Sequence, residues 1–269
     1  MIIDFHTHCF PDALAPRAIA SLSATFSTMS INHPQYDGTA AGLRDSMKRN
    51  GITRSVVCNI ATNAHQTHKV NDFAISLATS DDLIPLGSLH PDGEDPEGEI
   101  NRLQAAGIKG LKIHPDYIMT HFDSPSMYPI YELCEAHGMF LLSHTGYDPI
   151  SPDLFHAVPD QILHVLSDFP RLKVVAAHMG GLQCEGDVAD RLMGKENLWF
   201  DTSLISFDPD RRIPLLRRLV KEHGASRLLF ATDSPWSHVD EELDCIRRCD
   251  LPDDVLSRIF CENALSLLA

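Results

Sequence analysis

Three side chains with metal-binding or acid–base chemistry stand at alternate positions near the start of the chain. Asp4, His6 and His8 directly follow the apolar pair Ile2-Ile3. On a β-strand, side chains two residues apart leave the same face, so this spacing predicts that all three point in one direction. Two imidazoles on one face can chelate a borderline-soft divalent cation. Because the chain has 15 histidines in 269 residues, about one His-x-His pair arises by chance, and the motif depends on the residues that accompany it.

Similar side chains recur where later apolar runs end. In chain order they are Lys112, His114, His144, His178, Asp201 and Asp233. At any single position, a role in capping a helix or loop is the commoner explanation for such a residue. Several strand ends that offer imidazole nitrogens or carboxylates can instead surround one metal ion and leave a position open for water. Histidines outside this pattern are predicted to lie on the surface, among them His33, His65, His68, His121, His137, His156 and His238.

The elements that would position these residues alternate regularly along the chain. Apolar runs predict eight strands, which begin at Ile2 and then cover Arg54–Ile60, Leu83–Leu89, Ile108–Ile113, Met139–Ser143, Leu172–Ala177, Leu198–Phe200 and Arg227–Ala231. Helical spacing and end signals predict helices over Ala13–Leu22, Thr39–Asn50, Asn63–Ser80, Glu94–Ala106, Met127–His137, Asp153–Phe169, Asp187–Gly194, Arg211–His223, Glu241–Arg248 and Asp253–Leu268. The stretch from Ser23 to Asp37 is predicted to be a loop over the site.

Nearly continuous apolar strands that alternate with helices are typical of a parallel sheet buried on both faces. Eight such repeats with no change of composition predict an α/β fold, a single (β/α)8 TIM barrel over residues 1–269. An open doubly wound sheet is the alternative, but no Gly-rich phosphate turn follows the first strand. In a barrel the active site lies where the strands end, which is where the polar residues stand.

The overall composition restricts the partners. A formal net charge of −15 argues against a nucleic-acid surface and against binding to acidic membranes, because either would require a basic patch. The seven cysteines are scattered without a Cys-x-x-Cys motif, which predicts buried thiols in a reducing cytoplasm. We expect neither a signal peptide nor a membrane span, because the first residues lack a basic region followed by an apolar core and no apolar run reaches membrane-spanning length. We therefore expect a cytoplasmic protein with a small-molecule substrate; a homo-oligomer is compatible with the sequence.

Six segments in this order resemble the amidohydrolase superfamily. The closest branch is the amidohydrolase-related group that includes aminocarboxymuconate-semialdehyde decarboxylase. The segments are Asp4-Phe-His-Thr-His8, Gly110-Leu-Lys-Ile-His-Pro115, Leu142-Ser-His-Thr-Gly146, Ala177-His-Met-Gly-Gly181, Trp199-Phe-Asp-Thr-Ser203 and Leu229-Phe-Ala-Thr-Asp-Ser-Pro235. The resemblance spans the whole chain and is specific for the superfamily, although it does not specify a substrate.

The resemblance implies a role for each residue of the site. The implied metal ligands are His6, His8, His144 and Asp233, around one divalent ion, Zn²⁺ in the first place and Mn²⁺ or Fe²⁺ as alternatives. Asp233 would also hold the metal-bound water or take its proton, and His178 would lie beside that water or the developing charge. In other branches a strand-four lysine is carbamylated and bridges two metals; for Lys112 a free amine and a mononuclear site are expected.

Three residues are predicted to bind substrate. Lys112 and His114 are two positions apart, so both face one way and at least one reaches the pocket. Arg17 is a candidate for holding a substrate carboxylate through a bidentate pair, with an ordinary surface role as the alternative.

Three functions fit this residue set. The expected one is a metal-dependent hydrolase that acts on a small amide, ester or lactone through metal-activated water, with Asp233 as general base. The alternative is a non-oxidative decarboxylase (carboxy-lyase) of a small carboxylic acid, because the branch that the chain resembles contains decarboxylases. A non-catalytic metal-binding barrel is disfavoured, since a structural zinc site would be closed.

Overall fold

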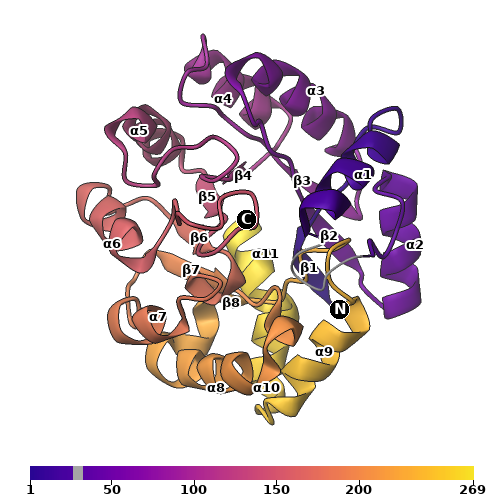
Figure 1. Ribbon diagram of the computed structural model, residues 1–269, viewed down its shortest axis with the longest axis vertical. Helices are drawn as coiled ribbons and strands as arrows, with labels where there is room; N and C mark the ends of the chain where they lie inside the picture. The colour runs from indigo at the N-terminus through magenta and orange to yellow at the C-terminus, as the bar shows by residue number, and fades with distance from the viewer. Residues whose placement is uncertain (27–32) are drawn as a thin grey trace.

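Eight short parallel strands form the centre of the computed structural model, which describes residues 1–26 and 33–269 (Figure 1). They are β1 (Ile3–Thr7), β2 (Arg54–Cys58), β3 (Leu83–Leu86), β4 (Gly110–Ile113), β5 (Phe140–Ser143), β6 (Val174–Ala176), β7 (Leu198–Asp201) and β8 (Leu228–Leu229). Strands β1 to β3 pair in sequence order, as do β4 to β8. Single bridges join the two groups, Gly87 with Leu111 on one side and Thr7 with Ser234 on the other. The strands therefore close into a (β/α)8 barrel, as the sequence predicts.

Helices surround this barrel as an outer ring (Figure 1). Their bounds are α1 (Ala15–Phe26), α2 (Ala40–Asn50), α3 (Thr67–Leu77), α4 (Pro96–Ala105), α5 (Tyr128–His137), α6 (Pro159–Asp168), α7 (Glu185–Arg191), α8 (Pro209–Leu219), α9 (Val239–Arg248), α10 (Asp253–Ser257) and α11 (Asn263–Leu268). The larger apolar core lies between strands and helices. A second core fills the barrel interior, where Ile3, Phe5 and Phe140 pack with Ala264 and Leu267 of α11. Helix α11 thus covers one end of the barrel and leaves the other end for the site.

Several predicted elements differ from the structure, three of them as follows. Ser23–Phe26 belong to α1, so the predicted loop is helical at its start, and its residues 27–32 lie outside the described part of the chain. Helix α6 begins at Pro159 rather than Asp153, because Val158 is extended and Pro159 occupies the first helical turn, where proline's missing N–H costs nothing. The predicted final helix is interrupted by a π-helical segment, Arg258–Glu262.

Strand β1 also departs from ideal alternation. Its register with β2 shifts between Asp4 and Thr7, and such an irregularity changes the direction of a side chain. The carboxylate of Asp4 accepts hydrogen bonds from the backbone N–H and hydroxyl of Thr232 at 3.0 and 2.7 Å. His6 and His8 line the cavity described below, whereas Asp4 does not. The prediction that all three side chains share one face is therefore wrong for Asp4.

Among the described residues, no helix is both long and apolar enough to cross a membrane.

Candidate metal centre and active site

A cavity of about 620 Å³ opens at the carboxyl ends of the strands. Its polar lining includes all eight residues that the sequence proposes for the site, together with Asp148: His6, His8, Arg17, Lys112, His114, His144, Asp148, His178 and Asp233. The barrel therefore gathers, in one hollow, residues that lie up to 227 positions apart (233 − 6). A cavity of this size accommodates a small organic molecule.

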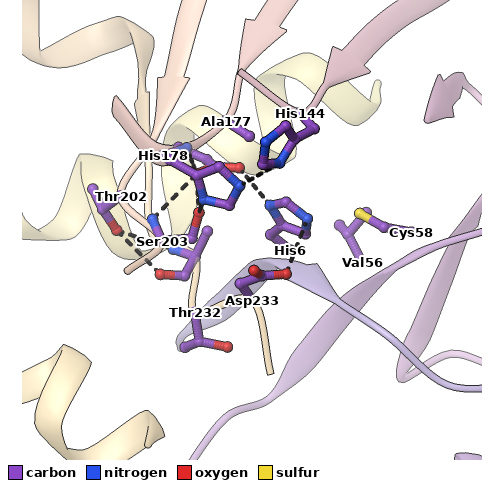
Figure 2. Close-up of polar contacts among 12 residues, drawn as sticks. His6, Val56, Cys58, His144, Ala177, His178, Thr202, Ser203, Thr232 and Asp233 are labelled. Carbon is purple, nitrogen blue, oxygen red and sulfur yellow. Dashed lines mark hydrogen bonds and ion pairs between the residues drawn. The ribbon is translucent and has the colours of Figure 1, made fainter. Parts of the chain in front are cut away.

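His6, His8 and Asp233 converge on one point of this cavity. Asp233 Oδ1 lies 3.0 Å from His8 Nε2 and 3.4 Å from His6 Nε2. A backbone hydrogen bond of 2.8 Å from the Asp233 N–H to the His6 carbonyl holds the two segments together. Asp233 has a φ of 66°, a left-handed conformation that aspartate tolerates better than most residues. Figure 2 shows the Asp233 carboxylate beneath the His6 ring.

The other ring nitrogen of each histidine is used to orient it. His6 Nδ1 donates to Asp201 Oδ2 at 2.8 Å, and His8 Nδ1 donates to the Cys58 carbonyl at 3.0 Å. With both Nδ1 atoms hydrogen-bonded to these acceptors, both Nε2 atoms point to the Asp233 carboxylate, where a bound cation would take the place of a proton. Two imidazole nitrogens and one carboxylate oxygen fit a divalent cation that keeps open coordination positions. The residues present therefore suit the metal that the sequence implies.

Lys112 contributes a buried amine to the same point. Its Nζ lies 3.1 Å from His6 Nε2, and the side chain is 1% exposed. Burial lowers the pKa of Lys112, although the carboxylates of Asp233 and Asp201 oppose the shift. A lysine with a lowered pKa is more readily found as the neutral amine.

His178 is connected to His6 through one carboxylate. Its Nδ1 donates to Ser203 Oγ at 2.8 Å, and this hydroxyl donates to Asp201 Oδ1 at 2.5 Å. The backbone N–H of His178 also donates to Asp201 Oδ1. Asp201 therefore orients two imidazoles of the site, a role that its place at the end of β7 did not reveal in the sequence. Burial would raise the pKa of Asp201, but the hydrogen bonds that its carboxylate accepts from His6 and Ser203 hold it below its usual range.

His144 is placed beside His178 rather than within the group of His6, His8 and Asp233. Its Nδ1 lies 3.0 Å from His178 Nε2 (Figure 2). Its ring is stacked on His114 with the centroids 4.1 Å apart, and these two rings form a separate group with Asp148. His144 therefore contacts the site through His178 and is not grouped with His6, His8 and Asp233.

Two buried carboxylates behind this stack were not identified in the sequence. Asp148 Oδ2 lies 3.4 Å from His114 Nε2 and 3.9 Å from His144 Nε2. Asp116 Oδ1 accepts a 2.9 Å hydrogen bond from His156 Nδ1. His156 is 2% exposed, so its predicted surface position is wrong. Both aspartates lie in loops that follow strand ends, β4 for Asp116 and β5 for Asp148. Their position shortly after a strand end is the one signal in the sequence that could have identified them.

Burial keeps four imidazoles of the site uncharged at neutral pH. It lowers the pKa of His6, His114 and His178, and it lowers that of His144 to about 3. The pKa of Asp233 lies below its usual range, because His6 and the hydrogen bond from His8 outweigh the opposing effect of burial. Neutral imidazoles beside an ionised carboxylate are the protonation states that bind a divalent metal.

A buried arginine supports the backbone of this site. Arg212 is fully buried, and its Nη1 forms a 2.8 Å ion pair with Glu185. Its Nη2 donates to the carbonyls of His178 and Ser203 at 2.8 and 3.3 Å. His178 has a φ of 56°, so the arginine secures a strained turn.

Replacing Arg212 by Met should therefore destabilise the fold by about 3 kcal/mol, since the two buried carbonyls lose their donor. Urea unfolding of the variant measures the change. Arg218→Met is the matched control on the same helix, because its side chain is 43% exposed and its ion pair with Glu222 is solvated; about 1 kcal/mol or less is expected there. Equal losses in the two variants would contradict the supporting role.

The chain matches the amidohydrolase family model over residues 3–269. Among curated proteins, it is 32% identical over 127 residues to the dihydroorotase of Leptothrix cholodnii. That match covers 44% of this chain and 37% of the relative, so it spans little more than a third of the dihydroorotase.

Solved structures share the fold along the whole chain. An uncharacterised TIM-barrel protein from Bordetella bronchiseptica has a TM-score of 0.80 at 19% identity, covering 99% of this chain and 98% of its own. The 5-carboxyvanillate decarboxylase LigW from Sphingomonas paucimobilis has a TM-score of 0.69 at 17% identity, with coverage of 99% and 98%. A protein from Pseudomonas putida described as a putative 2-pyrone-4,6-dicarboxylic acid hydrolase has a TM-score of 0.70 at 16% identity, with coverage of 99% and 97%. Identities this low establish the barrel alone.

Because the family model covers all but the first two residues, this chain belongs to the amidohydrolase family, whose members are enzymes.

Proposed function

We propose that this protein is a metal-dependent hydrolase that acts on a small amide, ester or lactone. The observation that carries the proposal is the convergence of His6 Nε2, His8 Nε2 and Asp233 Oδ1, with both imidazoles oriented by hydrogen bonds from Nδ1. In this proposal these three residues hold one divalent ion, Zn²⁺ in the first place. His144 would add its Nδ1 from the side of His178.

A divalent cation bound there would act as a Lewis acid and make a water molecule easier to deprotonate. The chain's own residues perform the proton transfers. Asp233, which the neighbouring imidazoles keep ionised, takes a proton from the attacking water as general base. His178, whose ring is held through Nδ1 by Ser203 and Asp201, would lie beside the attacking water and accept a hydrogen bond from it at Nε2.

Decarboxylation is the alternative function, and one observation favours it. Lys112 places its amine at the floor of the cavity, 3.1 Å from His6 Nε2. When it carries a proton, this amine can hold a carboxylate beside the metal. Hydrolysis is preferred because Asp233 and the metal ligands suffice for it, whereas carbon dioxide release also requires a substrate that stores the electrons left behind.

A substrate panel distinguishes the two reactions. Metal-loaded protein is incubated with small lactones, amides and hydroxybenzoate-type acids, and both acid release and carbon dioxide release are recorded. We expect acid release from at least one lactone or amide, and its loss in Asp233→Asn. Carbon dioxide release that disappears in His178→Ala, without hydrolysis of any lactone or amide, would replace the hydrolase by the decarboxylase.

The state of Lys112 is a separate prediction. We expect a free amine, so protein incubated with ¹³C-bicarbonate should show no carbamate signal by NMR, and Lys112→Ala should retain its metal while KM for anionic substrates rises. A carbamate signal that is absent from Lys112→Ala, together with two metal ions per chain, would instead indicate a bridged binuclear site.

All seven cysteines are free thiols, which supports the proposed cytoplasmic location.

A further inference from the structure

Helices α1 and α3 line the outer part of the cavity, and each contributes residues from one of its faces. From α1 and the turn before it, the lining includes Leu14, Arg17, Ala18 and Leu22. These positions recur at the spacing of a single helical face. The face is apolar apart from Arg17 and Ser21. Leu14 is 56% exposed, so apolar surface continues to the mouth of the cavity.

The second helix repeats this arrangement. Gln66, Lys69, Val70 and Phe73 line the cavity from α3 and the residue before it, at positions i, i+3, i+4 and i+7. Lys69 is the charged residue of this face, as Arg17 is of the other. Figure 1 shows α1 and α3 on the same side of the barrel, beside strands β1 to β3. The outer cavity thus has apolar walls that carry two cations.

Neither cation has a partner within the described part of the chain. No ion pair or hydrogen bond joins Arg17 or Lys69 to another described residue, and both side chains are exposed. Asp72, the carboxylate nearest to Lys69 on α3, is instead paired with Arg102. The two acidic residues of the cavity lining, Asp148 and Asp233, lie at its floor among the histidines. Two exposed cations without a carboxylate partner are unexpected in a chain with 37 acidic and 22 basic residues.

We propose that the substrate is an elongated, largely apolar acyl compound whose far end carries a carboxylate. Arg17 and Lys69 hold that carboxylate at the mouth, the apolar helix faces contact the body, and the acyl bond lies at His6, His8 and Asp233. This inference rests on the hydrolase function proposed above. Hydrolysis breaks the acyl C–O or C–N bond; the oxygen of water joins the acyl carbon, and the leaving oxygen or nitrogen takes a proton.

The placement of the cations also bears on the reaction class. A carboxylate held at the exposed mouth is remote from Lys112, which is buried at the floor. Such a carboxylate orients the substrate and does not leave as carbon dioxide. Apolar walls desolvate the body of the substrate, and the cations select its charge.

Paired chromogenic esters test this proposal. The probes are mono(4-nitrophenyl) esters of straight-chain dicarboxylic acids and 4-nitrophenyl esters of monocarboxylic acids of the same length, assayed with metal-loaded protein. We expect kcat/KM for the anionic ester to exceed that for its neutral partner by about tenfold at the best length. Arg17→Gln and Lys69→Gln should each lower this ratio about fivefold, mainly through KM. Lys48→Gln, an exposed cation outside the cavity lining, should preserve the ratio.

Calorimetry with two unreactive ligands separates this inference from the hydrolase assignment. We expect 6-phenylhexanoate to bind more tightly than 6-phenylhexan-1-ol, and Arg17→Gln and Lys69→Gln to remove the difference. If no ester is hydrolysed but this binding pattern is found, the anion site stands and the hydrolase assignment fails. If esters are hydrolysed without a preference for the anion, the proposed substrate class is wrong while the hydrolase assignment holds. If the acid and the alcohol bind equally, the proposed substrate class is wrong whatever the ester assay shows.

Discussion

Replacing His6 or His8 by Ala is expected to remove most of the bound metal and to lower kcat/KM by about 10³-fold or more. Each substitution removes one of the two Nε2 atoms that lie within 3.4 Å of Asp233 Oδ1. A Lewis acid contributes several kcal/mol of transition-state stabilisation, and about 4 kcal/mol corresponds to 10³ in rate. Elemental analysis of the dialysed variants and steady-state kinetics measure the two effects.

His65→Ala is the matched control, because it removes an exposed imidazole that does not line the cavity. Its metal content and turnover should equal those of the parent protein. His144→Ala should also lower the metal content, by less than the substitutions of His6 and His8, since His144 contacts the site through His178. A fully active protein without metal would contradict the metal-dependent function itself.

Asp233→Asn should abolish turnover while retaining more metal than the histidine variants. The amide keeps an oxygen that can coordinate a metal, but it cannot accept the proton of the attacking water. Loss of a general base costs about 10²–10⁴ in kcat. The low pKa of Asp233, which His6 and His8 maintain against burial, keeps the parent side chain ionised for this role.

The measurement pairs kcat with metal content for the same preparation, so that loss of metal and loss of the base are distinguished. Thermal unfolding of the metal-free proteins provides the control for folding. If Asp233→Asn kept near-normal turnover with its metal bound, Asp233 would be a ligand alone and the general base would have to be sought elsewhere in the cavity.

The fold and the three converging residues were predictable because both depend on patterns that the chain carries locally. Eight apolar runs alternate with helical spacing, and only a few closed arrangements bury such strands on both faces. In a parallel barrel all carboxyl ends meet at one rim. A residue that follows the end of a strand, such as His8 or Asp233, is therefore expected to lie beside the residues that follow the other strand ends.

The direction of each side chain depended instead on contacts between distant segments. The register shift in β1 turns Asp4 toward Thr232, although the alternation of the sequence predicts otherwise. The ring of His144 is fixed by stacking on His114, and no local pattern records that contact.

Two groupings of residues became visible only in three dimensions, although Arg17 was already a candidate in the sequence. Asp116 and Asp148 reach the histidines from loops, where no periodicity predicts which way a side chain points. Arg17 and Lys69 line one cavity because α1 and α3 pack on the same side of the barrel. The sequence by itself determined the barrel and the chemical types at its rim, since these follow from local periodicity; the tertiary structure decided the orientation and partners of the site, since these arise from packing between residues far apart in the chain.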